Sequence, residues 1–86
     1  MCLSSHVAPL HQEHEVLGWG PPRTDGRIGV IEWTCHCDRL AYELCRSGGL
    51  YFIRRYAGAT CSSDTDRVNW SEAQRQWEAL LRGRTR

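Results

Sequence analysis

Residues 40–56, LAYELCRSGGLYFIRRY, decide the fold of this chain. From Leu40 to Arg46, neighbouring side chains alternate with the period of two that is typical of a half-buried strand. Leu50 to Tyr56 predicts the strand that follows. Gly48 and Gly49 between them adopt positive φ angles without steric cost, which favours a tight turn. The stretch therefore predicts an antiparallel hairpin with a two-residue loop.

This loop length also predicts which residues face each other. Leu44 lies opposite Ile53 at the start of an apolar face, and Glu43 lies opposite Arg54 as a cross-strand ion pair. A four-residue loop would bring Phe52 opposite Glu43, which is a poorer match. The predicted inward side chains are those of Leu40, Tyr42, Leu44 and Ile53, and the other face carries Glu43, Phe52, Arg54 and Tyr56.

The segments before and after the hairpin predict the remaining elements of the domain. Residues 28–34 are rich in β-branched and aromatic side chains and predict a strand. Residues 58–67 predict a polar loop, in which Asp64 and Asp66 are solvated turn residues. We therefore expect a β-β-β-α domain over residues 28–86, an α+β fold in which a three-stranded antiparallel sheet carries one C-terminal helix on a face.

The C-terminal helix has clear boundary signals. Ser71 with Gln74 forms a capping box, with Asn69 and Glu72 as an overlapping alternative, and Gly83 marks the end. One apolar stripe predicts the side that packs on the sheet. Its members are Trp70, Ala73, Trp77, Leu80 and Leu81.

Residues 1–27 differ from the rest, because they contain all three prolines and weak apolar periodicity. We expect a partly ordered, irregular N-terminal arm, with a short helix from Pro9 that ends before Gly18.

Composition limits the function classes. The formal net charge is +1, from 11 basic and 10 acidic residues, and this argues against the strongly basic footprint of many nucleic-acid-binding domains. No stretch has the apolar length of a membrane-spanning helix, and the first residues lack the pattern of a signal peptide. We therefore expect a cytoplasmic protein without a membrane partner.

The tripeptide Cys35-His36-Cys37 suggests a metal site. A structural zinc ion takes four thiolate or imidazole ligands. Cys45 would lie about 26 Å from Cys37 along a strand, whereas Cys61 should return to the same end of the sheet. A zinc site would thus use Cys35, Cys37 and Cys61 with His36, or with His11 or His14 from the arm. The alternative is that Cys35 and Cys37 are small buried hydrophobic residues, and that no cofactor binds.

A thiol-dependent enzyme or redox carrier is the weakest of the functional hypotheses. An imidazolium beside a thiol would raise its thiolate fraction. Adjacent residues on a strand point to opposite faces, however, so that His36 would not serve Cys35 or Cys37. The thin core expected of so short a chain also leaves little room for a catalytic cleft. The sequence therefore favours a protein that is not an enzyme.

The leading hypothesis is a non-enzymatic binding module, an accessory or regulatory protein with a protein partner. Aromatic and arginine side chains are typical of interface hot spots. The predicted contact residues are Phe52, Arg54, Tyr56 and Glu43 on the outer sheet face, with Trp19 from the arm. In the alternative, the arm folds over this face through Trp19 or Leu10, and the face is not a contact surface. The runner-up is a nucleic-acid-binding regulator that uses Arg54, Arg82, Arg84 and Arg86. An exposed edge strand would also allow self-association.

Overall fold

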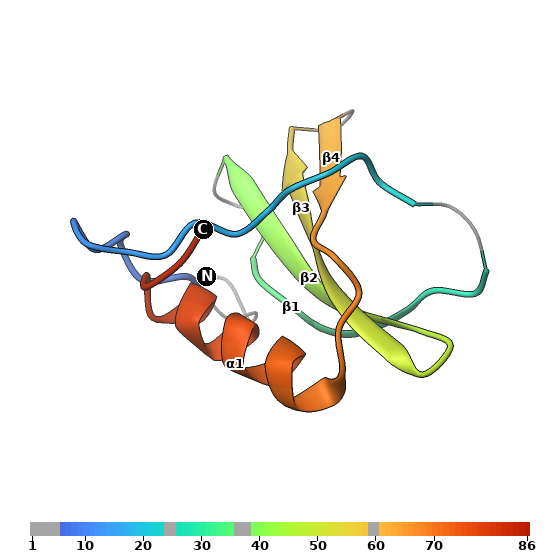
Figure 1. The fold of residues 1–86 in the computed structure, drawn as a ribbon. Coiled ribbons are helices and arrows are strands. Elements are labelled where there is room, and N and C mark those ends of the chain that lie inside the picture. The colour runs from blue at the N-terminus through green and yellow to red at the C-terminus, as the bar shows by residue number, and fades with distance from the viewer. Residues whose placement is uncertain (1–5, 24–25, 36–38, 59–60) are drawn as a thin grey trace.

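The structure is a computed structural model that describes residues 6–23, 26–35, 39–58 and 61–86 (Figure 1). One antiparallel sheet in the order β1-β2-β3-β4 is followed by one helix. This confirms the α+β class, the antiparallel sheet and the C-terminal helix, but the sheet has four strands rather than three. The elements are β1 (Gly29–Trp33), β2 (Leu40–Ser47), β3 (Leu50–Ala57), β4 (Cys61–Asp64) and α1 (Trp70–Leu81).

The central hairpin has the predicted register. Ser47 pairs with Leu50 around the Gly48-Gly49 loop, and Leu44 pairs with Ile53. Gly48 has a φ of 59°, a conformation that glycine adopts without a steric penalty.

The additional strand, β4, lies where we predicted a loop. Its sequence, CSSD, has no apolar alternation, and its backbone pairs with β3 from Ala57 opposite Cys61 to Arg54 opposite Asp64. The outer edge of β4 bonds to Gly20, whose N–H donates to the Asp64 carbonyl at 2.8 Å. Backbone pairing with β3, and with the arm at Asp64, therefore makes this polar segment a strand, and not side-chain hydrophobicity.

The helix starts at the alternative cap. The Asn69 side chain accepts a hydrogen bond from the Glu72 N–H at 2.9 Å, and Ser71 lies inside the first turn. The preferred Ser71–Gln74 assignment is therefore wrong by two residues. Gly83, with a φ of 74°, follows the helix as predicted.

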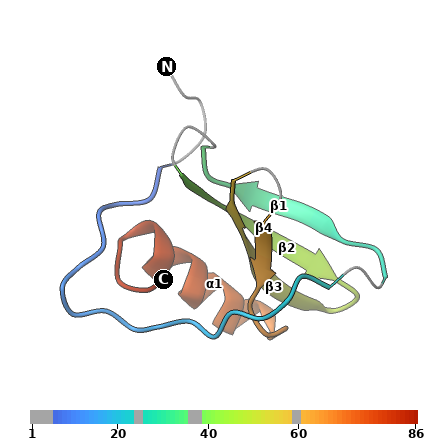
Figure 2. The same ribbon diagram turned by 90° about the horizontal axis from the view of Figure 1, so that it is seen from above.

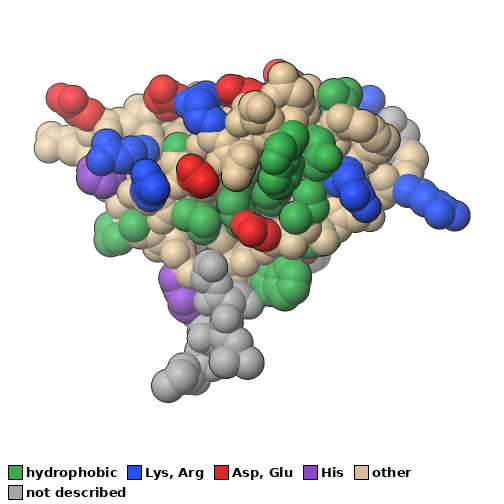
Figure 3. Space-filling model, turned by 90° about the horizontal axis from the view of Figure 1, so that it is seen from below, with side chains coloured by type: hydrophobic (Ala, Val, Ile, Leu, Met, Phe, Trp, Pro, Cys, Tyr) green, Lys and Arg blue, Asp and Glu red, His purple; other side chains and the backbone are tan. Residues whose placement is uncertain are grey.

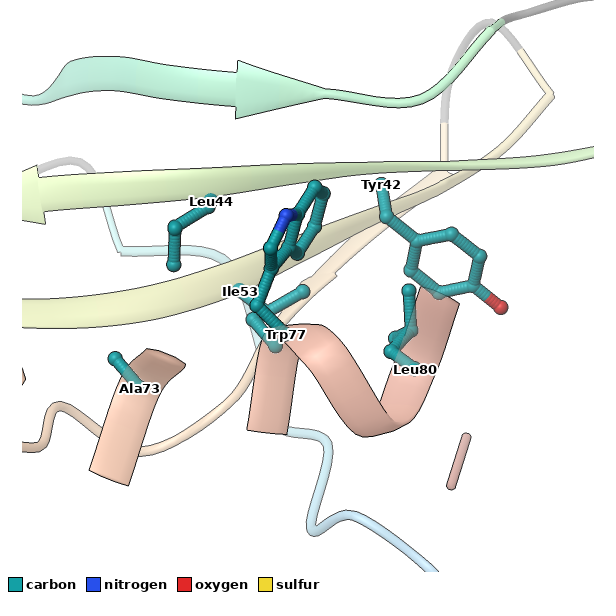
Figure 4. Packing of buried hydrophobic residues seen from close by; sticks show 6 residues of the cluster. All are labelled: Tyr42, Leu44, Ile53, Ala73, Trp77 and Leu80. Atoms are coloured by element: carbon teal, nitrogen blue, oxygen red, sulfur yellow. The ribbon is translucent and has the colours of Figure 1, made fainter. Parts of the chain in front are cut away.

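The core lies between α1 and one face of the sheet (Figure 4). Leu40, which we predicted to be inward, is instead 38% exposed, because it is the first residue of β2. Trp70, at the first turn of α1, is also exposed and packs on Tyr51 with 5.0 Å between ring centroids. The buried cluster consists of Tyr42, Leu44, Ile53, Ala73, Trp77 and Leu80.

The N-terminal arm, residues 6–23, forms no helix, so the predicted short helix is wrong. It first lies beside the C-terminal segment, where the N–H of Ala8 donates to Leu81 and the N–H of His11 donates to Gly83. It then crosses the edge of β4, where Gly20 bonds to Asp64, and reaches the side of the sheet opposite α1 at Arg23 (Figures 1 and 2). Within the described ranges, no helix is long and apolar enough to cross a membrane.

Candidate functional site

The face of the sheet opposite α1, where we predicted a contact surface, is largely covered. The Phe52 side chain is only 1% exposed. The guanidinium groups of Arg54 and Arg67 lie 5.5 Å and 5.3 Å from its ring centroid. The expectation that Phe52 is exposed on this face is therefore wrong, because arginine side chains cover its ring.

Asp64 joins β3, β4 and the arm on this face. Its carboxylate, 3% exposed, accepts hydrogen bonds from Arg54 Nε at 2.7 Å and Nη2 at 3.0 Å, and from the backbone N–H of Arg23 at 2.9 Å. Arg54 Nη2 also donates to the Arg23 carbonyl at 2.8 Å. The hydrogen bond to Asp64 raises the pKa of Arg54 above its ordinary value. Arg54 therefore holds the arm to the sheet.

Glu43 faces Arg54 across the strands as predicted, but its carboxylate binds another residue. The Tyr56 hydroxyl donates to Glu43 Oε1 at 2.7 Å. Burial raises the pKa of Tyr56, and the hydrogen bond to Glu43 raises it further. The structure thus brings together Glu43 and Tyr56, which are both half-buried. Tyr56 also shares a side-chain hydrogen bond with Arg54, which links this pair to the Asp64 network.

Trp19 lies on the other side of the sheet. Its ring centroid is 6.2 Å from that of Tyr42 in the core, and the Arg55 guanidinium lies 4.3 Å from the Trp19 ring centroid. Trp19 is therefore not part of the predicted surface. Trp19 lies there because this part of the arm runs on the helix side of the sheet. No periodic pattern in the sequence predicts the path of the arm.

The four arginines of the nucleic-acid hypothesis do not share one surface. Arg54 binds Asp64 on the sheet face opposite α1. Arg86 donates to the Leu80 carbonyl at 2.7 Å and to the Ala8 carbonyl at 2.6 Å, and its guanidinium lies 6.0 Å from the Tyr42 ring centroid. Only Arg82 and Arg84 of this set are exposed.

His36 and Cys37 of the zinc hypothesis lie outside the described residues. Cys35 is half-buried and Cys61 is exposed. Over the described ranges, no group of three or more His, Cys, Asp and Glu side chains is placed to hold a metal ion. Cys45 is fully buried in β2, and burial raises its thiol pKa to about 12, so this thiol is protonated near neutral pH.

The strand β1 provides an exposed apolar edge. It is an edge of the sheet, and Val30, Ile31 and Trp33 are 45%, 37% and 52% exposed. We expected an exposed edge strand from the sequence but did not name these residues as a contact surface. A β-bulge lies between Val30 and Glu32. Seen from below (Figure 3), the surface of the molecule carries several hydrophobic side chains among acidic and basic ones. GVIEW contains no proline, but no residue pattern in it shows that this strand lies at the edge of the sheet, so the sequence alone does not identify the surface.

The candidate site is therefore the β1 edge, next to a sheet face that arginines and the arm cover. The chain matches no protein-family model, no curated protein and no solved structure.

Proposed function

We propose that this chain is a small non-enzymatic binding module, an accessory or regulatory protein that engages another protein by strand addition at β1. In strand addition, an extended segment of the partner pairs with the backbone of an exposed edge, and side-chain pockets provide specificity. The observation that carries the proposal is the exposure of Val30, Ile31 and Trp33 on an edge strand.

The contrast between the two edges supports this choice. At the β4 edge, the last residue of the strand, Asp64, exchanges two backbone hydrogen bonds with Gly20 of the arm, at 2.8 Å and 3.0 Å. β1 carries apolar side chains, and its one acidic residue, Glu32, accepts a hydrogen bond from Trp77 Nε1 at 2.6 Å on the helix side. Trp33 supplies the aromatic anchor that interface hot spots favour. The β1 edge thus replaces the covered Phe52 face as the contact surface.

The first test is selection of random peptides by the purified chain. We expect the selected peptides to alternate apolar and other residues, because a strand presents alternate side chains to one face. The change Trp33→Ala should weaken their binding by about tenfold or more. Trp70→Ala is the matched control, because Trp70 is a similarly exposed tryptophan on α1, and it should leave binding unchanged.

Circular dichroism would establish that both variants remain folded. Equal binding by wild type and Trp33→Ala would refute the assignment of the site to β1. A steep loss of binding to a nucleic acid with rising salt, without any peptide binding, would favour the nucleic-acid hypothesis instead.

A further inference from the structure

We infer that the strand that pairs with β1 is β1 of a second copy of this chain, in a two-fold symmetric antiparallel arrangement. This inference rests on the proposed function, because it names the partner of the same edge. The argument comes from the direction of the backbone groups along β1, the effect of the bulge, and the positions of Arg46 and Glu32.

The hairpin register shows which way the backbone of β1 points. Ser47 and Leu50 close the two-residue loop, so β2 residues with odd numbers bond to β3 and those with even numbers face β1. The Thr34 N–H accordingly donates to the Tyr42 carbonyl at 2.9 Å. Val30 lies opposite Cys45, and Trp33 lies opposite Glu43. Because Cys45 and Glu43 are odd-numbered and bond to β3, the backbone groups of Val30 and Trp33 point away from β2, to the outer side of β1.

The bulge makes this edge complementary to itself. In a regular strand, residues three apart lie on opposite faces. Ile31 is the extra residue of the bulge, so Val30 and Trp33 lie on the same face, opposite α1. A two-fold related copy then places Val30 opposite Trp33 of the second copy, and the symmetry repeats the contact. Pairs of aromatic and β-branched residues stabilise antiparallel strands. Bulges often prevent edge pairing, but this one aligns the two apolar residues.

The charges near β1 fit the same register. Arg46 Nη2 lies 3.9 Å from the position that a Cβ would take at Gly29, so the guanidinium lies beside the N-terminal end of β1. With Val30 opposite Trp33, Gly29 lies opposite Thr34 of the second copy and diagonal to its Glu32. Arginine reaches a diagonal neighbour across strands. Each interface thus gains two contacts between opposite charges, from Arg46 to Glu32, on the helix side of the sheet.

The test is the molecular mass of the full chain by sedimentation equilibrium, from micromolar to near-millimolar concentration. We expect a monomer–dimer equilibrium whose dissociation constant rises at least tenfold with Trp33→Ala and is unchanged with Trp70→Ala. Two further variants test the register. Val30→Asp and Trp33→Lys should each be monomeric alone, because each places a charge opposite an apolar residue. Their equimolar mixture should form a heterodimer, which native mass spectrometry would identify.

The outcomes separate this inference from the proposed function. A wild-type chain that stays monomeric, but whose Trp33 still governs peptide binding, would overturn the dimer and leave strand addition intact. A dimer that is unaffected by Trp33→Ala would show that another surface associates, and the inference would fall. Loss of dimer in both charged variants without recovery in the mixture would contradict the Val30–Trp33 register. Absence of both dimer and peptide binding would remove both proposals. Circular dichroism of every variant establishes that the fold is intact.

Discussion

The environment of the Asp64 side chain in the structure differs from the one that the sequence predicts. Asp64 lies in a polar stretch of sequence, which predicts a solvated turn. In the structure, its side chain is only 3% exposed. The carboxylate is buried because two nitrogens of Arg54 and the Arg23 N–H satisfy its oxygens. A buried charge with such partners is tolerated, but removal of one charge leaves the other without compensation.

The change Asp64→Asn should therefore lower the free energy of unfolding by about 3 kcal/mol or more, since a buried partner of Arg54 loses its charge. Asp66→Asn is the matched control, because Asp66 is exposed and two residues away, and its effect should stay within about 0.5 kcal/mol. Urea unfolding monitored by tryptophan fluorescence measures both values. Equal midpoints for the two variants would show that the Arg54–Asp64 pair contributes little to stability.

At the scale of elements, the hairpin and the helix follow from local signals, but the helix start does not. Two capping boxes overlap in residues 69–74, and both satisfy the spacing rule. The structure uses Asn69, because α1 begins at Trp70, where the ring packs on Tyr51 of β3. A tertiary contact thus separates two signals that are locally equivalent.

The change Asn69→Ala should destabilise the protein by about 1 kcal/mol, because the Glu72 N–H loses its side-chain acceptor. Ser71→Ala, inside the first turn, should have a smaller effect or none, since alanine has the higher helix propensity. Thermal unfolding followed by circular dichroism at 222 nm compares the two variants. A larger loss of stability in Ser71→Ala than in Asn69→Ala would mean that the helix begins two residues later in solution.

At the scale of the whole molecule, the N-terminal arm connects both ends of the domain. Its backbone bonds to Leu81 at the end of α1 and to Gly83 after the helix, and then to Asp64 at the end of β4. The arm passes close to Gly83, because a Cβ there would collide with the carbonyl oxygen of Pro9. The arm therefore packs as part of the domain where it meets the C-terminal segment.

The change Gly83→Ala should cost more than about 1 kcal/mol, because it combines a positive φ of 74° with the clash against Pro9. Gly49→Ala is the control, since a Cβ at Gly49 meets no atom within 4 Å. Hydrogen exchange should show faster exchange of the Ala8 and His11 amides in Gly83→Ala alone. Unchanged protection of these amides would indicate that the arm does not depend on this contact.

Local sequence patterns were sufficient to predict the hairpin register, the existence of the helix and most of the core, including Tyr42, Leu44, Ile53 and Trp77. These features depend on alternation, turn residues and helix periodicity, which act between residues close together in the chain. The strand β4, the burial of Phe52 and the position of Trp19 follow from the folded arrangement alone. Each of these depends on backbone pairing or contact between segments far apart in the sequence, for which no local pattern exists. The exposure of β1 belongs to the same class, because an edge strand is defined by what does not pair with it elsewhere in the sheet.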